Sequence, residues 1–84
     1  MEARLGVIAI VVEGDRESAI EIQKNLSDFA DIIEGRMGIP DKEANISVIS
    51  LIVKGSVERI SALSGKLGKL KGVTVKSAVT SVSV

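Results

Sequence analysis

The stretch LGVIAIVV at residues 5–12 decides the fold class of this 84-residue chain. It is rich in β-branched residues and stops at a turn signal, Glu13-Gly14-Asp15, which together predict a β-strand. Successive side chains of a strand point to opposite faces. The strand is therefore apolar on both faces, with Leu5, Val7, Ala9 and Val11 on one and Ile8, Ile10 and Val12 on the other.

The hydrophobic period then changes from two to between three and four residues, which predicts a helix lying on a sheet. The expected buried stripe of this helix is Ala19, Ile22, Leu26, Phe29, Ala30 and Ile33. Asp15 or Ser18 can cap its start. A second helix is predicted after the capping residue Ser56, with Gly72 at its end and a stripe of Val57, Ile60, Leu63, Leu67 and Leu70. Beside that stripe lie small residues, Ser61, Gly65 and Gly68, which indicate close approach of another backbone.

Three further strands complete the chain. Residues 32–39 alternate around glycines and predict a weak strand at a sheet edge. After a polar connection at residues 40–45, residues 46–53 (ISVISLIV) form a second strand that is apolar on both faces. Residues 73–84 alternate loosely and predict the last strand, so the element order is βαββαβ.

This order predicts a single α+β domain over residues 1–84, a ferredoxin-like two-layer sandwich. We expect an antiparallel sheet with spatial order 4-1-3-2 and both helices on one face. The helical crossover from the first strand to the third predicts that these two central strands pair in parallel.

One layer of helices cannot cover two apolar faces of the central strands. A large exposed apolar patch is unusual on a monomer. We therefore predict that the second face is buried in a homo-oligomer, a dimer or a tetramer. The residues assigned to this interface are Ile8, Ile10, Val12, Ile49, Leu51 and Val53.

The composition excludes most routes to catalysis. The chain has no Cys, His, Trp or Tyr, and Phe29 is its single aromatic residue. It therefore lacks the usual nucleophiles, general bases and transition-metal ligands. We expect no catalytic residues, no metal site and no cofactor.

The absence of cysteine, of a transmembrane segment and of a signal-peptide pattern in the first residues, MEAR, predicts a cytoplasmic protein. Eleven basic and eleven acidic residues give a net charge of zero, which argues against strong non-specific binding to nucleic acid. No apolar run reaches the roughly 18 residues of a transmembrane helix, so no membrane partner is expected. The second half of the chain is basic, and Arg59, Lys66, Lys69 and Lys71 are the candidates for any contact with DNA.

Two places are candidate ligand sites. Gly14, Asp15 and Arg16 follow the first strand and open the first helix, where backbone N–H groups can hold a polar ligand; the alternative is a simple turn and cap. Arg36, beside Gly38, offers a forked donor among residues of little bulk. It can bind a carboxylate or phosphate ligand, or pair with an acid across an interface.

Three strings carry a family resemblance: IIEGRMGIP at residues 32–40, ISVISLIVKG at residues 46–55 and ISALSGKLGKLKGVTVKS at residues 60–77. The chain resembles a small family of regulators of the iron-only hydrogenase system. Members of that family look like stand-alone ACT-like domains, similar in fold to the C-terminal domain of the nickel-responsive repressor, which is a tetramer. The resemblance carries neither the nickel site of that repressor nor its DNA-reading arm, because the residues for both are missing here.

The resemblance implies an oligomeric regulatory module that senses a small molecule. ACT domains usually take an amino acid at a subunit interface near the turn after the first strand, which here is residues 13–18; Arg36 of a neighbouring copy would approach it. A ligand-free adaptor for hydrogenase or its maturation proteins is the alternative, and a transcription regulator that contacts DNA is a further one.

Overall fold

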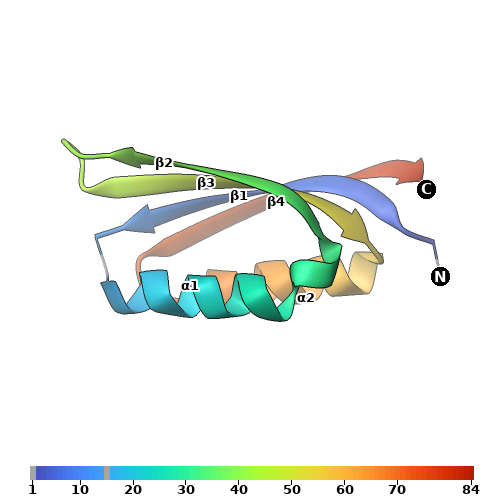
Figure 1. The fold of residues 1–84 in the computed structure, drawn as a ribbon, viewed down its shortest axis with the longest axis horizontal. Coiled ribbons are helices and arrows are strands. Elements are labelled where there is room, and N and C mark those ends of the chain that lie inside the picture. Colours follow the sequence, from blue (N-terminus) through green and yellow to red (C-terminus); the bar gives the residue numbers. More distant parts are fainter. Residues whose placement is uncertain (1, 15) are drawn as a thin grey trace.

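The computed structural model describes residues 2–14 and 16–84, which form a four-stranded sheet with two helices on one of its faces (Figure 1). The elements follow in the order β1 (Arg4–Glu13), α1 (Arg16–Asp28), the 3-10 turn η1 (Ala30–Ile32), β2 (Ile33–Asp41), β3 (Ile46–Gly55), α2 (Val57–Gly68) and β4 (Val73–Ser83). The sheet order is β2-β3-β1-β4. The predicted ferredoxin-like βαββαβ sandwich is confirmed.

One strand pairing was predicted wrongly. The central strands β1 and β3 are antiparallel, with Ile8 opposite Leu51 and Ile10 opposite Ile49. The helical crossover joins β1 to β2, and β3 lies between these two strands. The crossover rule applies to strands that a helix connects directly. It therefore makes β1 and β2 parallel, and leaves every hydrogen-bonded pair of the sheet antiparallel.

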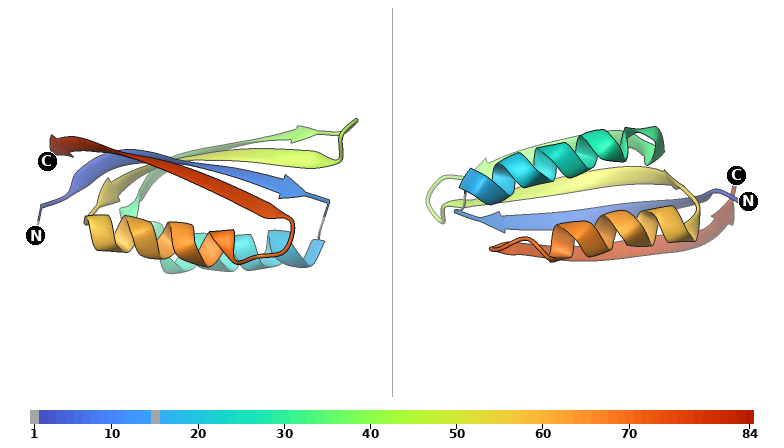
Figure 2. Two further views of the ribbon diagram at one scale, coloured as in Figure 1. Left: turned by 180° about the vertical axis from the view of Figure 1, so that it is seen from behind. Right: turned by 90° about the horizontal axis from the view of Figure 1, so that it is seen from below.

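The core lies between the sheet and the two helices. Its fully buried side chains come from the inward face of β1 and β3 and from the stripe of each helix: Ile8, Ile10, Ile22, Leu51, Val53, Ile60, Leu63 and Leu67. Seen from the helix side, α1 lies on the β2 side of the sheet and α2 on the β4 side (Figure 2). Among the described helices, none is long and apolar enough to cross a membrane.

The faces of the central strands are the reverse of the prediction. The six residues assigned to an oligomer interface lie under the helices: Ile8, Ile10, Val12, Leu51 and Val53 are buried, and Ile49 packs against them. The face away from the helices carries Val7, Ala9, Val48 and Ile52, which are exposed. We call this surface the outer face. The inward face carries the larger side chains of the central strands, whereas the outer face also carries Ala9 and Ser50, so the helices cover the face with more apolar surface to bury.

The first helix is shorter than its stripe predicted. It ends at Asp28, after which Phe29 and Ile32 are buried but Ala30 is exposed. The 3-10 turn has the same three-residue spacing as a helical stripe. The helical spacing of apolar residues therefore extends beyond the end of α1 into η1, where the chain already turns back toward the sheet. Ile33, which was assigned to the helix, is the first residue of β2.

Hydrogen bonds satisfy backbone groups at the start of α2 and at the ends of the strands. Ser56 caps α2 by accepting from the Arg59 N–H over 3.2 Å, as predicted. Gly72 does not end α2 as predicted, because the helix stops at Gly68. Gly72 lies in the following turn with a φ of 72°, and its carbonyl accepts the Glu13 N–H at 2.8 Å. At the opposite end of the sheet, the Val84 N–H donates to the Ala3 carbonyl over 2.9 Å.

Candidate functional site

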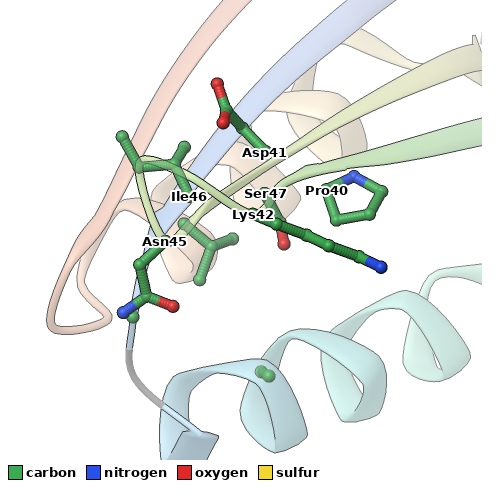
Figure 3. A pocket seen from close by; sticks show the side chains of 9 residues that line it. Pro40, Asp41, Lys42, Asn45, Ile46 and Ser47 are labelled. Carbon is green, nitrogen blue, oxygen red and sulfur yellow. The ribbon is translucent and has the colours of Figure 1, made fainter.

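The turn after β1 faces a hollow of about 360 Å³ beneath the β2–β3 hairpin (Figure 3). The hollow is lined by Val12, Gly14, Ala19, Pro40, Asp41, Lys42, Asn45, Ile46 and Ser47. The Lys42 side chain extends across the space above α1, whereas the Asp41 carboxylate points away from that helix (Figure 3). A cation, an amide and a hydroxyl therefore surround a space that is open to solvent.

Gly14 joins this turn to the hairpin. Its N–H donates to the Asn45 carbonyl over 3.1 Å, and both residues have a positive φ, of 52° and 56°. A Cβ at Gly14 would lie 2.6 Å from the Asn45 amide nitrogen. The glycine is thus required by backbone conformation and by close approach. Asn45 was not predicted for this site, although Asn is the residue most tolerant of a left-handed conformation after glycine.

A second place combines charge with apolar surface. Two adjoining hollows of about 290 and 150 Å³ lie between α1 and the edge strand β2, and they share Gln23, Leu26 and Arg36. We call them the α1–β2 groove. Arg36 Nη1 donates to Gln23 Oε1 over 3.1 Å. None of the ion pairs formed within residues 2–14 and 16–84 includes Arg36.

The structure separates the predicted ligand residues into two groups. Gly14 lines the hollow under the hairpin, and Arg36 and Gly38 line the α1–β2 groove. Asp15 lies outside the described residues, and Arg16 opens α1 but its side chain is likewise not described. Gln23 was missed, because its position on the solvent side of a helix gave no signal until the edge strand was in place.

The basic surface of α2 is partly engaged within the chain. Arg59 Nη2 lies 2.6 Å from Asp31 Oδ1, and its guanidinium lies 4.8 Å from the centre of the Phe29 ring. The Lys66 ammonium lies 5.5 Å from the same ring. Of the four cations considered for a DNA contact, Lys69 and Lys71 have neither interaction with residues 2–14 or 16–84, so the geometry adds no support to that alternative.

Within the described residues, the two glycines of α2 meet no backbone from outside the helix. A Cβ at Gly65 or at Gly68 would have no atom outside the helix within 4 Å, and Ser61 is exposed. No group of three His, Cys, Asp or Glu side chains that could hold a metal ion occurs within the described part of the chain.

The sequence comparison identifies the family. Residues 4–77 match the model of the TM1266-like family, described as "Iron-only hydrogenase system regulator, putative". The chain belongs to this family. The family resemblance seen in the three sequence strings is confirmed. No curated protein matches the chain.

Solved structures agree with the family and the fold. This member of the TM1266-like family superposes on the uncharacterized protein TM1266 of Thermotoga maritima with a TM-score of 0.91 and 37% identity, covering 93% of this chain and 98% of that one. The ACT domain of GTP pyrophosphokinase from Chlorobium tepidum gives 0.76 at 26% identity, with 90% and 99% covered. The C-terminal domain of the MgtC protein of Mycobacterium tuberculosis, at 11% identity, gives 0.67 over 92% and 87% and shows the fold alone.

Proposed function

We propose that this chain is a cytoplasmic, non-enzymatic regulatory module of the iron-only hydrogenase system. It acts as a homo-oligomer of ACT-like domains and changes its state when a small polar ligand binds. Membership of the regulator family and the likeness to an ACT domain support the regulatory role. The proposal of a homo-oligomer rests on the exposed apolar side chains of the outer face of the sheet.

The outer face presents large apolar side chains from three adjacent strands. Met37 and Ile39 on β2 are 64% and 60% exposed, and Ile52 on β3 is 54% exposed. Val7 on β1 and Val48 on β3 extend the same surface, and both are exposed. A monomer rarely leaves a contiguous apolar surface of this kind in water.

The size of the outer face fits a dimer. Four strands of about ten residues, spaced about 4.8 Å apart, cover a flat area of roughly 630 Å². The accessible area of a side-chain surface exceeds its flat area, and a specific dimer buries about 600 to 800 Å² from each partner. The outer face of one copy is therefore large enough to hold a second copy.

Charges at the two ends of the outer face favour one arrangement. Lys54 stands opposite Leu5 at one end of the β1–β3 pair, and Glu13 stands at the other end, where Asp41 also lies. A two-fold axis that reverses the strand direction places the acidic end of one sheet over Lys54 of the other. The opposite arrangement would stack like charges.

Sedimentation velocity at tens of micromolar protein tests the oligomer. We expect the native protein to sediment as a dimer or a larger oligomer, and Ile52→Lys to sediment as a folded monomer, because a charge is costly in a buried apolar interface. Ile20→Lys is the matched control, since Ile20 is 57% exposed on α1, away from the outer face. A monomeric native protein, or an Ile52→Lys variant with an unchanged oligomer, would contradict the proposal.

Thermal denaturation in the presence of small polar molecules tests the ligand response. A ligand that binds the folded state raises the unfolding temperature by mass action. A shift that depends on an amino acid or a related acid supports a sensor. Absence of any shift across such compounds would favour the ligand-free adaptor.

A further inference from the structure

The α1–β2 groove has an apolar floor beside a single positive charge. Leu26 is buried at the bottom, and Ile33 and Ile49 are half-buried beside it. The Arg36 guanidinium and the Gln23 amide form the polar wall. This wall comes from α1 and β2 together, so the groove exists only because the edge strand folds back along the helix.

Arg36 keeps donors for a ligand. A guanidinium carries five N–H groups in one plane, and the Gln23 oxygen takes one of them. No described carboxylate lies within ion-pair distance of Arg36. A planar fork with free donors matches the two oxygens of a carboxylate.

The glycine of the groove is not required by the fold. A Cβ at Gly38 would meet a single atom, Ile49 Cγ1, at 3.8 Å, which is ordinary contact. Gly6 differs, because a Cβ there would lie 2.8 Å from the Ala78 carbonyl oxygen. Glycine weakens a strand, and inside a strand it often marks a place where a ligand approaches closely. At Gly38 the missing side chain leaves the groove open beside Arg36.

We propose that the α1–β2 groove binds a small aliphatic carboxylate, with its carboxylate on Arg36 and Gln23 and its tail on Leu26, Ile33 and Ile49. This inference rests on the proposed response to a small polar ligand and names the chemical class of that ligand. The hollow beside Gly38 and Ile49 has a volume of about 150 Å³, which is smaller than the pockets that hold drug-sized molecules and limits the tail inside it to a few carbon atoms. The groove lies on the helix side of the sheet, so a second copy on the outer face leaves it accessible.

Chemical-shift titration of the native oligomer by ¹H–¹⁵N NMR tests this inference, with isovalerate as the probe. We expect saturable shifts at the amides of Arg36, Gly38 and Ala30, with a Kd on the order of millimolar, as a single charged contact with a short tail provides. The neutral isovaleramide and the tailless acetate should each bind roughly tenfold more weakly. Inorganic phosphate should compete no better than acetate, because it too can use the Arg36 guanidinium but not the apolar floor.

Two variants and one control separate the contributions. Arg36→Gln should weaken isovalerate roughly tenfold or more, and Gly38→Val should abolish its binding by filling the groove while Arg36 remains. Arg4→Gln is the matched control, because Arg4 pairs with Glu2 far from the groove, and it should bind as the native protein does. Absence of isovalerate shifts in the groove, or equal binding by Arg36→Gln, would overturn the inference. A native protein that gives no such shifts but is stabilised by another small molecule would leave the proposed sensing function standing.

Discussion

The guanidinium of Arg59 on α2 donates to the carboxylate of Asp31 in η1 over 2.6 Å, which joins α2 to the turn that follows α1. The same guanidinium lies over the ring of Phe29, the single aromatic residue of the chain. The contact falls where the chain leaves α1 and turns back toward the sheet.

Removing this contact should lower stability by a modest amount. Both side chains are well exposed to solvent, so the ion pair contributes about 0.5 kcal/mol, and the contact with the ring adds about 0.5 to 1 kcal/mol. Arg59→Ala should therefore cost about 1 to 1.5 kcal/mol in urea unfolding, and Asp31→Ala less. A double-mutant cycle isolates the pair, and its coupling energy should fall in high salt. A coupling energy indistinguishable from zero in low salt would show that the pair contributes nothing.

The two faces of β3 should respond oppositely to the same substitution. Leu51 is fully buried in the core beneath the helix layer, so Leu51→Lys places an uncompensated charge in the core and should prevent folding. Ile52 points to the outer face, so Ile52→Lys should fold with an unchanged circular dichroism spectrum. A folded Leu51→Lys protein would mean that the sheet faces are assigned the wrong way round.

Alanine at Gly65 should stabilise the protein. The added Cβ meets no atom outside the helix within 4 Å, and alanine favours a helix over glycine by about 0.5 to 1 kcal/mol. Gly6→Ala is the comparison, and it should destabilise by about 1 to 3 kcal/mol because the new Cβ would collide with backbone atoms of β4. Urea denaturation measures both. A loss of stability or of the oligomer in Gly65→Ala would indicate that the line of small residues packs against another chain.

Alanine at Gly14 should destabilise the turn after β1. Its φ of 52° costs a residue with a Cβ about 1 to 2 kcal/mol, and the Asn45 amide must also move. The double variant with Gly14→Ala and Asn45→Ala removes the steric overlap but keeps the backbone strain. Adding Gly14→Ala to the Asn45→Ala protein should therefore lower its stability by less than adding Gly14→Ala to the native protein. Thermal unfolding of the three variants measures this difference. Equal losses at Gly14 in both backgrounds would show that Asn45 plays no part in the constraint.

The order of elements could be predicted from the sequence because the hydrophobic period and the turn or capping residues agree along the central strands and at the start of α2. Residues 5–12 and 46–53 are β-branched runs, and Ser56 begins α2 as its capping role predicts. The direction of pairing between the two central strands could not be predicted from the crossover alone. It depends on the position of β3 between β1 and β2, which is determined by tertiary packing and not by local sequence.

The inward face was ambiguous because the central strands are apolar on both faces. Ile8 and Leu51 differ little from Val7 and Ile52 in hydrophobicity, so burial could not be decided from residue type. A weaker signal was present in size and polarity. The outer face also carries Ala9, Ser50 and Lys76, whereas the inward face carries the larger side chains of the central strands.

The spacing of residues along the sequence did not reveal that the predicted ligand residues lie in two separate places. Arg36 and Gly38 are two residues apart on one strand, so their shared groove follows from strand period. Gly14 lies at the end of β1, and Gln23 reaches Arg36 only because α1 runs alongside the edge strand. The position of a helix along a sheet is set by packing of the whole core, which a local pattern does not encode.

The hydrogen bond between the Val84 N–H and the Ala3 carbonyl brings the two chain ends together at one end of the sheet, with the β2–β3 hairpin at the other (Figure 1). A short peptide linker between these ends would close the chain into a ring without disturbing the strands. New ends could then be opened in the exposed turn at residues 42–45. The molecule is thus arranged to accept circular permutation, and a reporter fused at the opened hairpin would stand beside the hollow at Gly14.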